Sequence, residues 1–277
     1  MNINKKKPFV ITLAHEKGGT GKSTLSTHLA IGLMYYNSNY KVSLIDLDHR
    51  QLSSWNFFSN RLKHNLQIPN LHFCEKLTAS LKDSKKEAFE DDFNNLNFKM
   101  NSMQDSDFII IDIAGSHNNY MIASMSFTDL LITPVTESFF DIDAIVRLSK
   151  VEKNIMNGPF YEIVFEERKA RKLKDLPQLK WSLVINRASA LYHENSEKVH
   201  EILENISKNL DFSIDHIIKD RQIYKELCNH GLTIFDLPHL IQDMTMIRMK
   251  AHAEMDQWIF KVIETVIKQK ENQIIRI

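Results

Sequence analysis

A glycine-rich stretch near the start of the chain carries the residue types that hold a phosphate group. It reads His15-Glu16-Lys17-Gly18-Gly19-Thr20-Gly21-Lys22-Ser23-Thr24. An apolar run at 9–14 predicts a buried strand before it, and an amphipathic run at 25–33 predicts a helix after it. Glycines let backbone N–H groups converge on one anion, and a helix N-terminus adds partial positive charge. The chain has 7 glycines, and the clustering of three of them here favours a phosphate-binding loop over an ordinary tight turn.

This loop holds two lysines with different expected tasks. Lys22 is placed to reach the β- and γ-phosphates of a nucleotide, and Ser23 to bind Mg²⁺. The plain phosphate-loop pattern has a glycine where Glu16 stands and does not require Lys17. Because Lys22 already balances the phosphate charge, we expect Lys17 to point to phosphates held by a second copy of the chain. The positions expected to contact the nucleotide are Gly18, Gly19, Thr20, Gly21, Lys22, Ser23 and Thr24.

Two further apolar runs, 41–46 and 107–112, each end in an aspartate and predict buried parallel strands. Their last residues are Asp46 and Asp112, and Asp48 follows the first. In a parallel sheet these carboxylates lie at the same edge as the phosphate loop. We expect Asp112 to hold Mg²⁺ through a water molecule, and a carboxylate at 46–48 to orient the attacking water. The alternative for the second role is a pair of acids that cap a strand end in solvent.

Length and composition predict one large α/β domain over residues 1–277. Hydrophobic residues make up 43% of the chain and charged residues 25%, which is typical of globular proteins. The order of predicted strands and helices favours a mostly parallel twisted sheet with helices on both faces, as in the P-loop NTPases. The polar segment 75–104 is predicted to be a helical insertion.

Charge and cysteine content narrow the functional classes. The formal net charge is +0, so any binding to nucleic acid needs a local patch. Cys74 and Cys228 are far apart, which favours a reducing compartment over a disulfide framework. We find no signal peptide and no run approaching about 18 apolar residues, and therefore expect no membrane insertion.

Two later segments have more than one interpretation. The basic residues from Arg168 to Lys174, together with Lys198 and Arg221, are candidates for contacts with DNA phosphates, and a solvated surface is the favoured alternative for the run. Phe139 and Phe140 lie in a loop that opens a helix predicted to run to about residue 157. Core packing is favoured for these two rings over an apolar dimer surface.

The Lys-Gly-Gly-x-Gly-Lys-Ser form of the loop resembles the deviant Walker A loop of the ParA/MinD ATPases, which are ATP-driven dimers that position cargo in bacterial cells. The resemblance implies ATP and Mg²⁺ as ligands, a role for Lys17 across a dimer, and slow hydrolysis that needs Asp46. A predicted strand at 181–185 ends at Asn186, whose amide can read the adenine edge because it offers donor and acceptor together. The resemblance places Asn186 at the base-binding end, and a strand-end cap is the alternative.

Segments 45–61, 133–141 and 219–237 resemble the MipZ group of this family, which positions the division plane. The resemblance covers nearly the whole chain and is weakest over 75–104. It implies a homodimer on ATP that binds DNA without sequence preference and blocks FtsZ polymerisation. It also implies recruitment by ParB and a cytoplasmic, nucleoid-associated location enriched near the ParB-bound origin at the cell poles.

Three other functions share these motifs. A ParA-type partition ATPase would differ only in its cargo. A MinD-like membrane ATPase would need the apolar face of the last helix, from Trp258 to Ile267, to be exposed, and we favour core packing for that face. A metabolic ligase such as dethiobiotin synthetase shares the fold, but its phosphate loop lacks a lysine at the position of Lys17.

Overall fold

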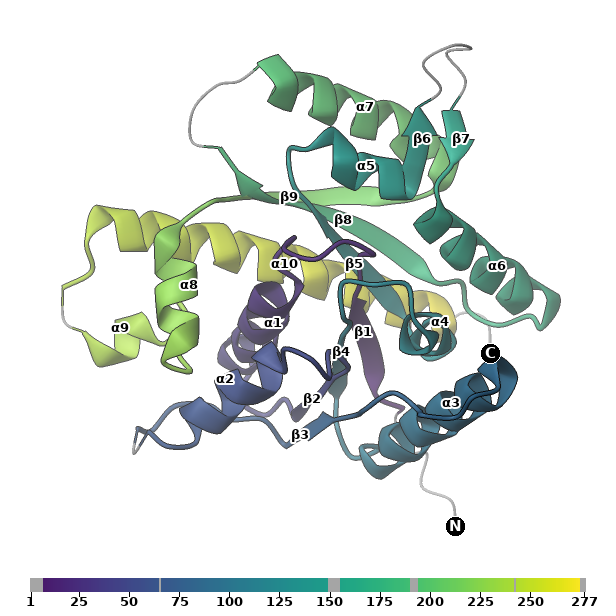
Figure 1. The fold of residues 1–277 in the computed structure, drawn as a ribbon. Helices are drawn as coiled ribbons and strands as arrows, with labels where there is room; N and C mark the ends of the chain where they lie inside the picture. Colours follow the sequence, from purple (N-terminus) through teal and green to yellow (C-terminus); the bar gives the residue numbers. More distant parts are fainter. Residues whose placement is uncertain (1–6, 65, 149–154, 190–193, 242, 275–277) are drawn as a thin grey trace.

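The chain folds around one parallel β-sheet (Figure 1). The structure is a computed structural model, and it describes residues 7–64, 66–148, 155–189, 194–241 and 243–274. The sheet has seven strands in the order β3-β2-β4-β1-β5-β8-β9, and every neighbouring pair is parallel. The strands are β1 Phe9–Leu13, β2 Val42–Asp46, β3 Phe73–Lys76, β4 Phe108–Asp112, β5 Leu130–Val135, β8 Lys180–Ala188 and β9 Ser213–Lys219.

Helices cover both faces of this sheet, which confirms the predicted fold class (Figure 1). One face packs against α1 Lys22–Tyr36, α2 Ser53–Arg61, α8 Gln222–Asn229, α9 Leu237–Leu240 and α10 Met246–Ile274. The other packs against α3 Lys85–Ser102, α4 Asn119–Met125, α5 Phe139–Ile145, α6 Pro159–Leu173 and α7 Glu194–Leu210. The amphipathic pattern of the sequence predicts a helix over 193–210, which matches α7 except that residue 193 lies outside the described residues, as do residues 275–277.

The central strands are mostly apolar because both of their faces are buried. In β1, Phe9, Ile11 and Leu13 pack into one core, while Val10 packs into the other. This alternation follows from the two-residue period of a strand. A strand buried on both sides therefore leaves its polar chemistry to the residues at its carboxyl end, which here are Asp46 and Asp112.

The long helix predicted after Phe139 is wrong. Helix α5 ends at Ile145, and the chain continues into β6 Val146–Leu148, which pairs with β7 Ile155–Asn157 as an antiparallel two-stranded sheet. The N–H of Gly158 then donates to the carbonyl of Ile145 at 2.8 Å. A Cβ at Gly158 would lie 2.3 Å from the Ala144 carbonyl oxygen, so this return past α5 requires glycine. The part of the predicted helix over 149–154 lies outside the described residues.

Helix α10 buries the apolar face that a membrane-binding ATPase would need. Trp258, Ile259, Val262 and Val266 are among its residues in the core, as expected, while Ile267 is 48% exposed. Within the described residues, no helix combines the length and apolar character that crossing a bilayer requires.

A buried ion pair joins α2 to the segment before α9. The Arg61 guanidinium donates to both carboxylate oxygens of Asp236, at 2.8 and 2.7 Å, and both side chains are fully buried. Asp236 also accepts from the hydroxyls of Tyr35 and Thr233. Burial raises the pKa of Asp236, but the hydrogen bonds and charge of Arg61 outweigh it and bring that pKa below its usual value. The carboxylate is therefore stable only while the guanidinium is present.

We expect Arg61→Leu to lower the free energy of unfolding by about 3–5 kcal/mol, because it leaves Asp236 as an uncompensated buried charge. Urea denaturation measures the change. The matched control is Lys41→Leu, which removes one partner of the exposed pair with Asp105 and should cost at most about 1 kcal/mol. Equal losses in the two variants would contradict this account of the pair.

Candidate active site

The phosphate loop connects β1 to α1, as predicted. Its backbone conformation and its close packing require glycine at particular positions. Gly19 and Gly21 have φ values of 81° and 92°, in the left-handed region that favours glycine. A Cβ at Gly21 would lie 2.1 Å from the amide nitrogen of Asn186. Helix α1 begins directly afterwards at Lys22, so its free N–H groups face the loop. The loop is thus built to receive an anion.

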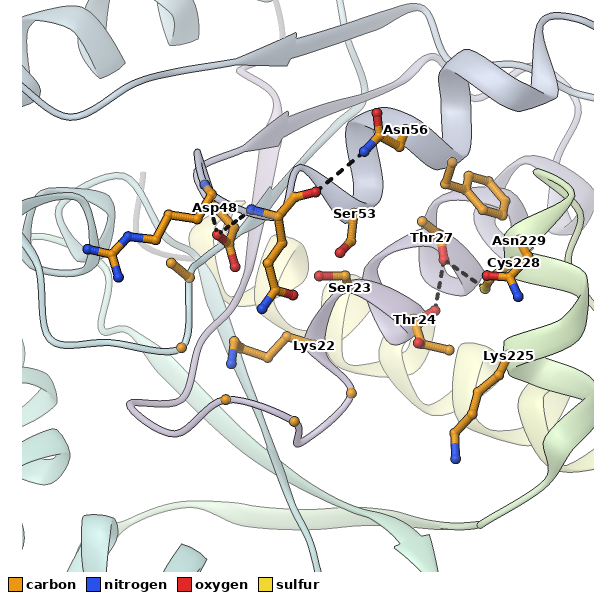
Figure 2. A pocket seen from close by; sticks show the side chains of 18 of the residues that line it. Lys22, Ser23, Thr24, Thr27, Asp48, Ser53, Asn56, Lys225, Cys228 and Asn229 are labelled. Carbon is orange, nitrogen blue, oxygen red and sulfur yellow. Dashed lines mark hydrogen bonds between the residues drawn. The ribbon is translucent and has the colours of Figure 1, made fainter.

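Lys22 points back over its own loop (Figure 2). Its Nζ donates to the carbonyl of Lys17 at 2.9 Å. Burial lowers the pKa of this ammonium, while the charges of Asp112 and Asp48 act to raise it. A phosphate oxygen could replace the backbone carbonyl as the acceptor, which suits the predicted contact with a nucleotide.

The register of the sheet places two aspartates side by side. Asp46 at the end of β2 is the direct partner of Asp112 at the end of β4. Both are buried, and Asp112 accepts from the Ser54 hydroxyl at 2.6 Å. Burial first and the charge of Asp46 second raise the pKa of Asp112 to about 7. Burial is also the main cause that raises the pKa of Asp46. The two buried carboxylates are therefore suited to binding a cation.

The residues present fit a Mg²⁺ ion. The Oδ1 atom of Asp112 is buried and has no hydrogen-bond partner among the described residues. Ser23 lines the adjoining cavity and can supply a hydroxyl. Carboxylate and hydroxyl oxygens are the ligands that Mg²⁺ takes in nucleotide sites, together with phosphate oxygens and water.

The two aspartates of the Asp46-Leu47-Asp48 turn have different surroundings. Asp46 accepts from the backbone N–H groups of Asp48 and Trp55, both at 2.9 Å, and does not line the cavity. Asp48 does line it, beside Lys22 (Figure 2). Geometry therefore favours Asp48 as the carboxylate that meets an attacking water, with Asp46 holding the turn and the start of α2 in place. The family resemblance assigned this role to Asp46, and the sequence alone does not show which of the two acids faces the cavity.

Lys17 pairs with an acid that sequence reasoning did not assign. Its Nζ lies 2.6 Å from Oδ1 of Asp141, and its side chain is 47% exposed while Asp141 is buried. Burial opposes the charge on Asp141, but the hydrogen bonds of Lys17 and Thr136 bring its pKa below its usual value. The available signal was an acid in the first turn of α5, the helix that follows β5. The neighbouring Phe140 is 76% exposed, so the core interpretation of that ring is wrong.

Asn186 lies against the phosphate loop. Its amide donates to the carbonyl of Thr20 at 2.8 Å, and the next residue, Arg187, lines the cavity. On the opposite side Gly115 meets the loop so closely that a Cβ there would lie 2.6 Å from the Cα of Gly18. The loop is therefore held between the ends of β8 and β4.

A cavity of about 580 Å³ opens over these groups, between α1, α2 and α8 (Figure 2). This volume falls within the range typical of small-molecule and cofactor sites. Among its lining residues are Gly18, Gly19, Gly21, Lys22, Ser23, Thr24, Thr27, Asp48, Arg50, Asn56, Gly115, Arg187, Lys225, Cys228 and Asn229.

Comparison with known protein families identifies the family of this chain. The model of ATPase MipZ matches residues 9–263. The chain belongs to the MipZ family of ATPases. Membership of this family identifies the chain as an ATPase, which binds a nucleotide.

Solved structures share the fold of this MipZ-family chain at low sequence identity. The McdA–ATP complex of Cyanothece, an aspartate-to-alanine variant, is 16% identical with a TM-score of 0.64, over 94% of this chain and 97% of the other. The septum site-determining protein MinD of Pyrococcus horikoshii, complexed with Mg-ADP, is 14% identical with a TM-score of 0.60, over 95% and 98%. A plasmid partition protein of Borrelia burgdorferi is 22% identical with a TM-score of 0.51, over 82% and 97%.

Several basic residues considered for DNA contact are engaged inside the MipZ-family fold. Arg168 donates to the Asp211 carbonyl and Arg171 to the Thr128 carbonyl, both at 2.7 Å. Arg221 pairs with Glu254 at 3.1 Å. These guanidinium groups hold α6 and α10 in place. The exposed basic residues among the candidates are Lys169, Lys172, Lys174 and Lys198.

We expect Asp48→Ala to bind ATP and keep its stability while losing hydrolysis by about a hundredfold or more, because the cavity-facing carboxylate is gone. The matched variant Asp46→Ala should instead lose about 1–3 kcal/mol of unfolding free energy, since two buried N–H groups lose their acceptor. Phosphate release and urea denaturation measure the two effects. A stable Asp46→Ala protein without ATPase activity, beside an active Asp48→Ala protein, would return the water-orienting role to Asp46.

Proposed function

We propose that the chain is an ATP-dependent dimerisation switch that positions the division plane by inhibiting FtsZ polymerisation away from midcell. The observation that carries this proposal is Lys17. Lys22 already reaches back over the chain's own loop, so the subunit has a lysine for its own phosphates without Lys17, whose ammonium pairs with Asp141. Its partial exposure leaves it accessible to the phosphates of a second copy. If a second copy completes the site, ATP would control dimerisation as well as serve as the substrate.

The residues of each subunit would divide the work of binding and hydrolysis. Loop N–H groups and Lys22 would bind the phosphates, and Asn186 would contact the base. Ser23 and Asp112 would hold Mg²⁺, which neutralises charge on the phosphates when it is bound. Asp48, supported by Asp46, would orient water. Turnover is proposed to be slow, so that the closed dimer persists long enough to diffuse.

ATP would act on Lys17 by offering a better partner than Asp141. In the monomer, the ammonium is held by one carboxylate. In a closed dimer it would exchange that carboxylate for the more highly charged phosphates of the partner subunit. Hydrolysis and phosphate loss would remove this attraction and return Lys17 to Asp141.

The cellular context follows from family membership. We propose recruitment by ParB, DNA binding without sequence preference through exposed lysines, and a cytoplasmic location on the nucleoid near the ParB-bound origin. A ParA-type partition role is the second candidate, because a plasmid partition protein shares the fold. Burial of the apolar face of α10 argues against a MinD-like membrane role.

We expect Lys17→Ala to bind ATP but to remain monomeric. The control, Lys22→Ala, should fail earlier, at ATP binding. Fluorescent-nucleotide titration measures binding, and light scattering after gel filtration measures mass. A normal ATP-dependent dimer of Lys17→Ala would exclude the role of this lysine across the interface.

We also expect the protein to abolish FtsZ sedimentation in GTP when it is supplied with a slowly hydrolysed ATP analogue, and to leave the polymer intact with ADP. Lys17→Ala should leave the polymer intact with either nucleotide. Intact polymer in the presence of a proven dimer would assign the chain a different cargo and favour partition.

A further inference from the structure

His15 occupies the point where β1 passes into the phosphate loop. Its ring is buried and stacks on Phe160 of α6 at a centroid distance of 6.1 Å. Its Nδ1 atom accepts the backbone N–H of Lys17 at 2.9 Å. A backbone N–H can only donate, so Nδ1 carries no proton and Nε2 carries it. Nε2 then donates to the backbone carbonyl of Asp141 at 3.3 Å.

The two residues that His15 joins through their backbones are the same two that form the exposed ion pair. Lys17 and Asp141 are thus connected twice, once by an ion pair at 2.6 Å and once by a neutral imidazole. The carboxylate is fixed further by Thr136, whose N–H and hydroxyl donate to Oδ2 at 2.9 and 2.6 Å. The ammonium of the ion pair is accessible to solvent and can be exchanged, whereas the His15 ring that makes the other connection is buried.

We propose that His15 is a positioning residue for Lys17, holding its backbone at a fixed place relative to α5 while the ammonium exchanges Asp141 for the phosphates of a second subunit. This inference rests on the proposed function of Lys17. It assigns His15 no contact with the nucleotide. Its effect would therefore appear in dimerisation and not in ATP binding.

The ring must stay neutral for this task, since a proton on Nδ1 would face the Lys17 N–H. Burial lowers the pKa of His15 to about 4. The charged groups that face the ring are Asp141 from α5, which acts to raise that pKa, and Lys22 and Lys17 from the loop, which act to lower it. Phe160, which stacks on the ring from α6, carries no charge. We therefore expect dimerisation to show no inflection attributable to His15 between about pH 6 and 8.

Three substitutions separate the two hydrogen bonds. His15→Asn puts an amide oxygen at the place of Nδ1 and keeps the acceptor for Lys17. His15→Gln puts its amide at the place of Nε2 and loses that acceptor. His15→Ala removes both contacts. Losing the bond to Lys17 should raise the dimer dissociation constant about tenfold in Gln and Ala, while Asn stays within about threefold of the parent.

Sedimentation equilibrium with a slowly hydrolysed ATP analogue measures these constants, and nucleotide titration of the monomers should change by less than about threefold in all three variants. Parent-like dimerisation of His15→Ala would overturn the proposal. So would a His15→Asn protein that is folded and as impaired as His15→Ala.

A second measurement needs neither ATP nor a dimer. The nitrogen shifts of the His15 ring in the free monomer should show the Nε2–H form, and the Nδ1–H form would overturn the proposal. If Lys17→Ala dimerises normally, the proposed role of Lys17 fails and the positioning role fails with it. If Lys17→Ala is monomeric and His15→Ala dimerises like the parent, only the role of His15 fails.

Discussion

The site depends on one constraint, the parallel register that brings Asp46 beside Asp112 at the buried ends of β2 and β4. Burial is the main cause that raises the pKa of both carboxylates, and the charge of Asp46 raises the pKa of Asp112 further. Hydrogen-bond donors offset this effect. They are the N–H groups of Asp48 and Trp55 and the hydroxyl of Ser54. These donors all belong to segment 48–55, which covers the turn after β2 and the first turn of α2. The position of that segment is therefore coupled to the charge at the centre of the site.

This coupling explains why nucleotide binding can reach beyond the cavity. A Mg²⁺ ion between the phosphates and Asp112 would relieve the repulsion that the donors now offset. Helix α2 is joined in turn to the segment before α9 by the buried pair of Arg61 and Asp236. Contacts therefore run from Asp112 through Ser54 and α2 to the segment before α9.

The sequence was informative where local pattern decides structure, and less so where distant residues meet. The apolar runs that end at Asp46 and Asp112 predicted the strands, and the glycine cluster predicted the loop. The partner of Lys17 lies 124 positions along the chain, and that of Arg61 lies 175 positions away. Hydrophobic periodicity does not predict contacts between residues so far apart in the sequence. The β6–β7 hairpin was missed for a different reason: segment 146–157 is short, and its strands are identified only by their pairing with each other.

Solvent exposure decides which contacts of the phosphate loop can be exchanged. The Lys17 side chain is 47% exposed and that of Asp141 is 1% exposed, so solvent reaches the ammonium but not the carboxylate. The hydrogen bonds through the His15 ring do not involve the ammonium. Thr136 donates twice to the Asp141 carboxylate, which keeps these two donors when Lys17 leaves it. In the proposed dimer, the partner's phosphates would compete with Asp141 for the Lys17 ammonium while these other contacts stay in place. The loop would then change its partner without changing its shape, and nucleotide binding would control assembly reversibly.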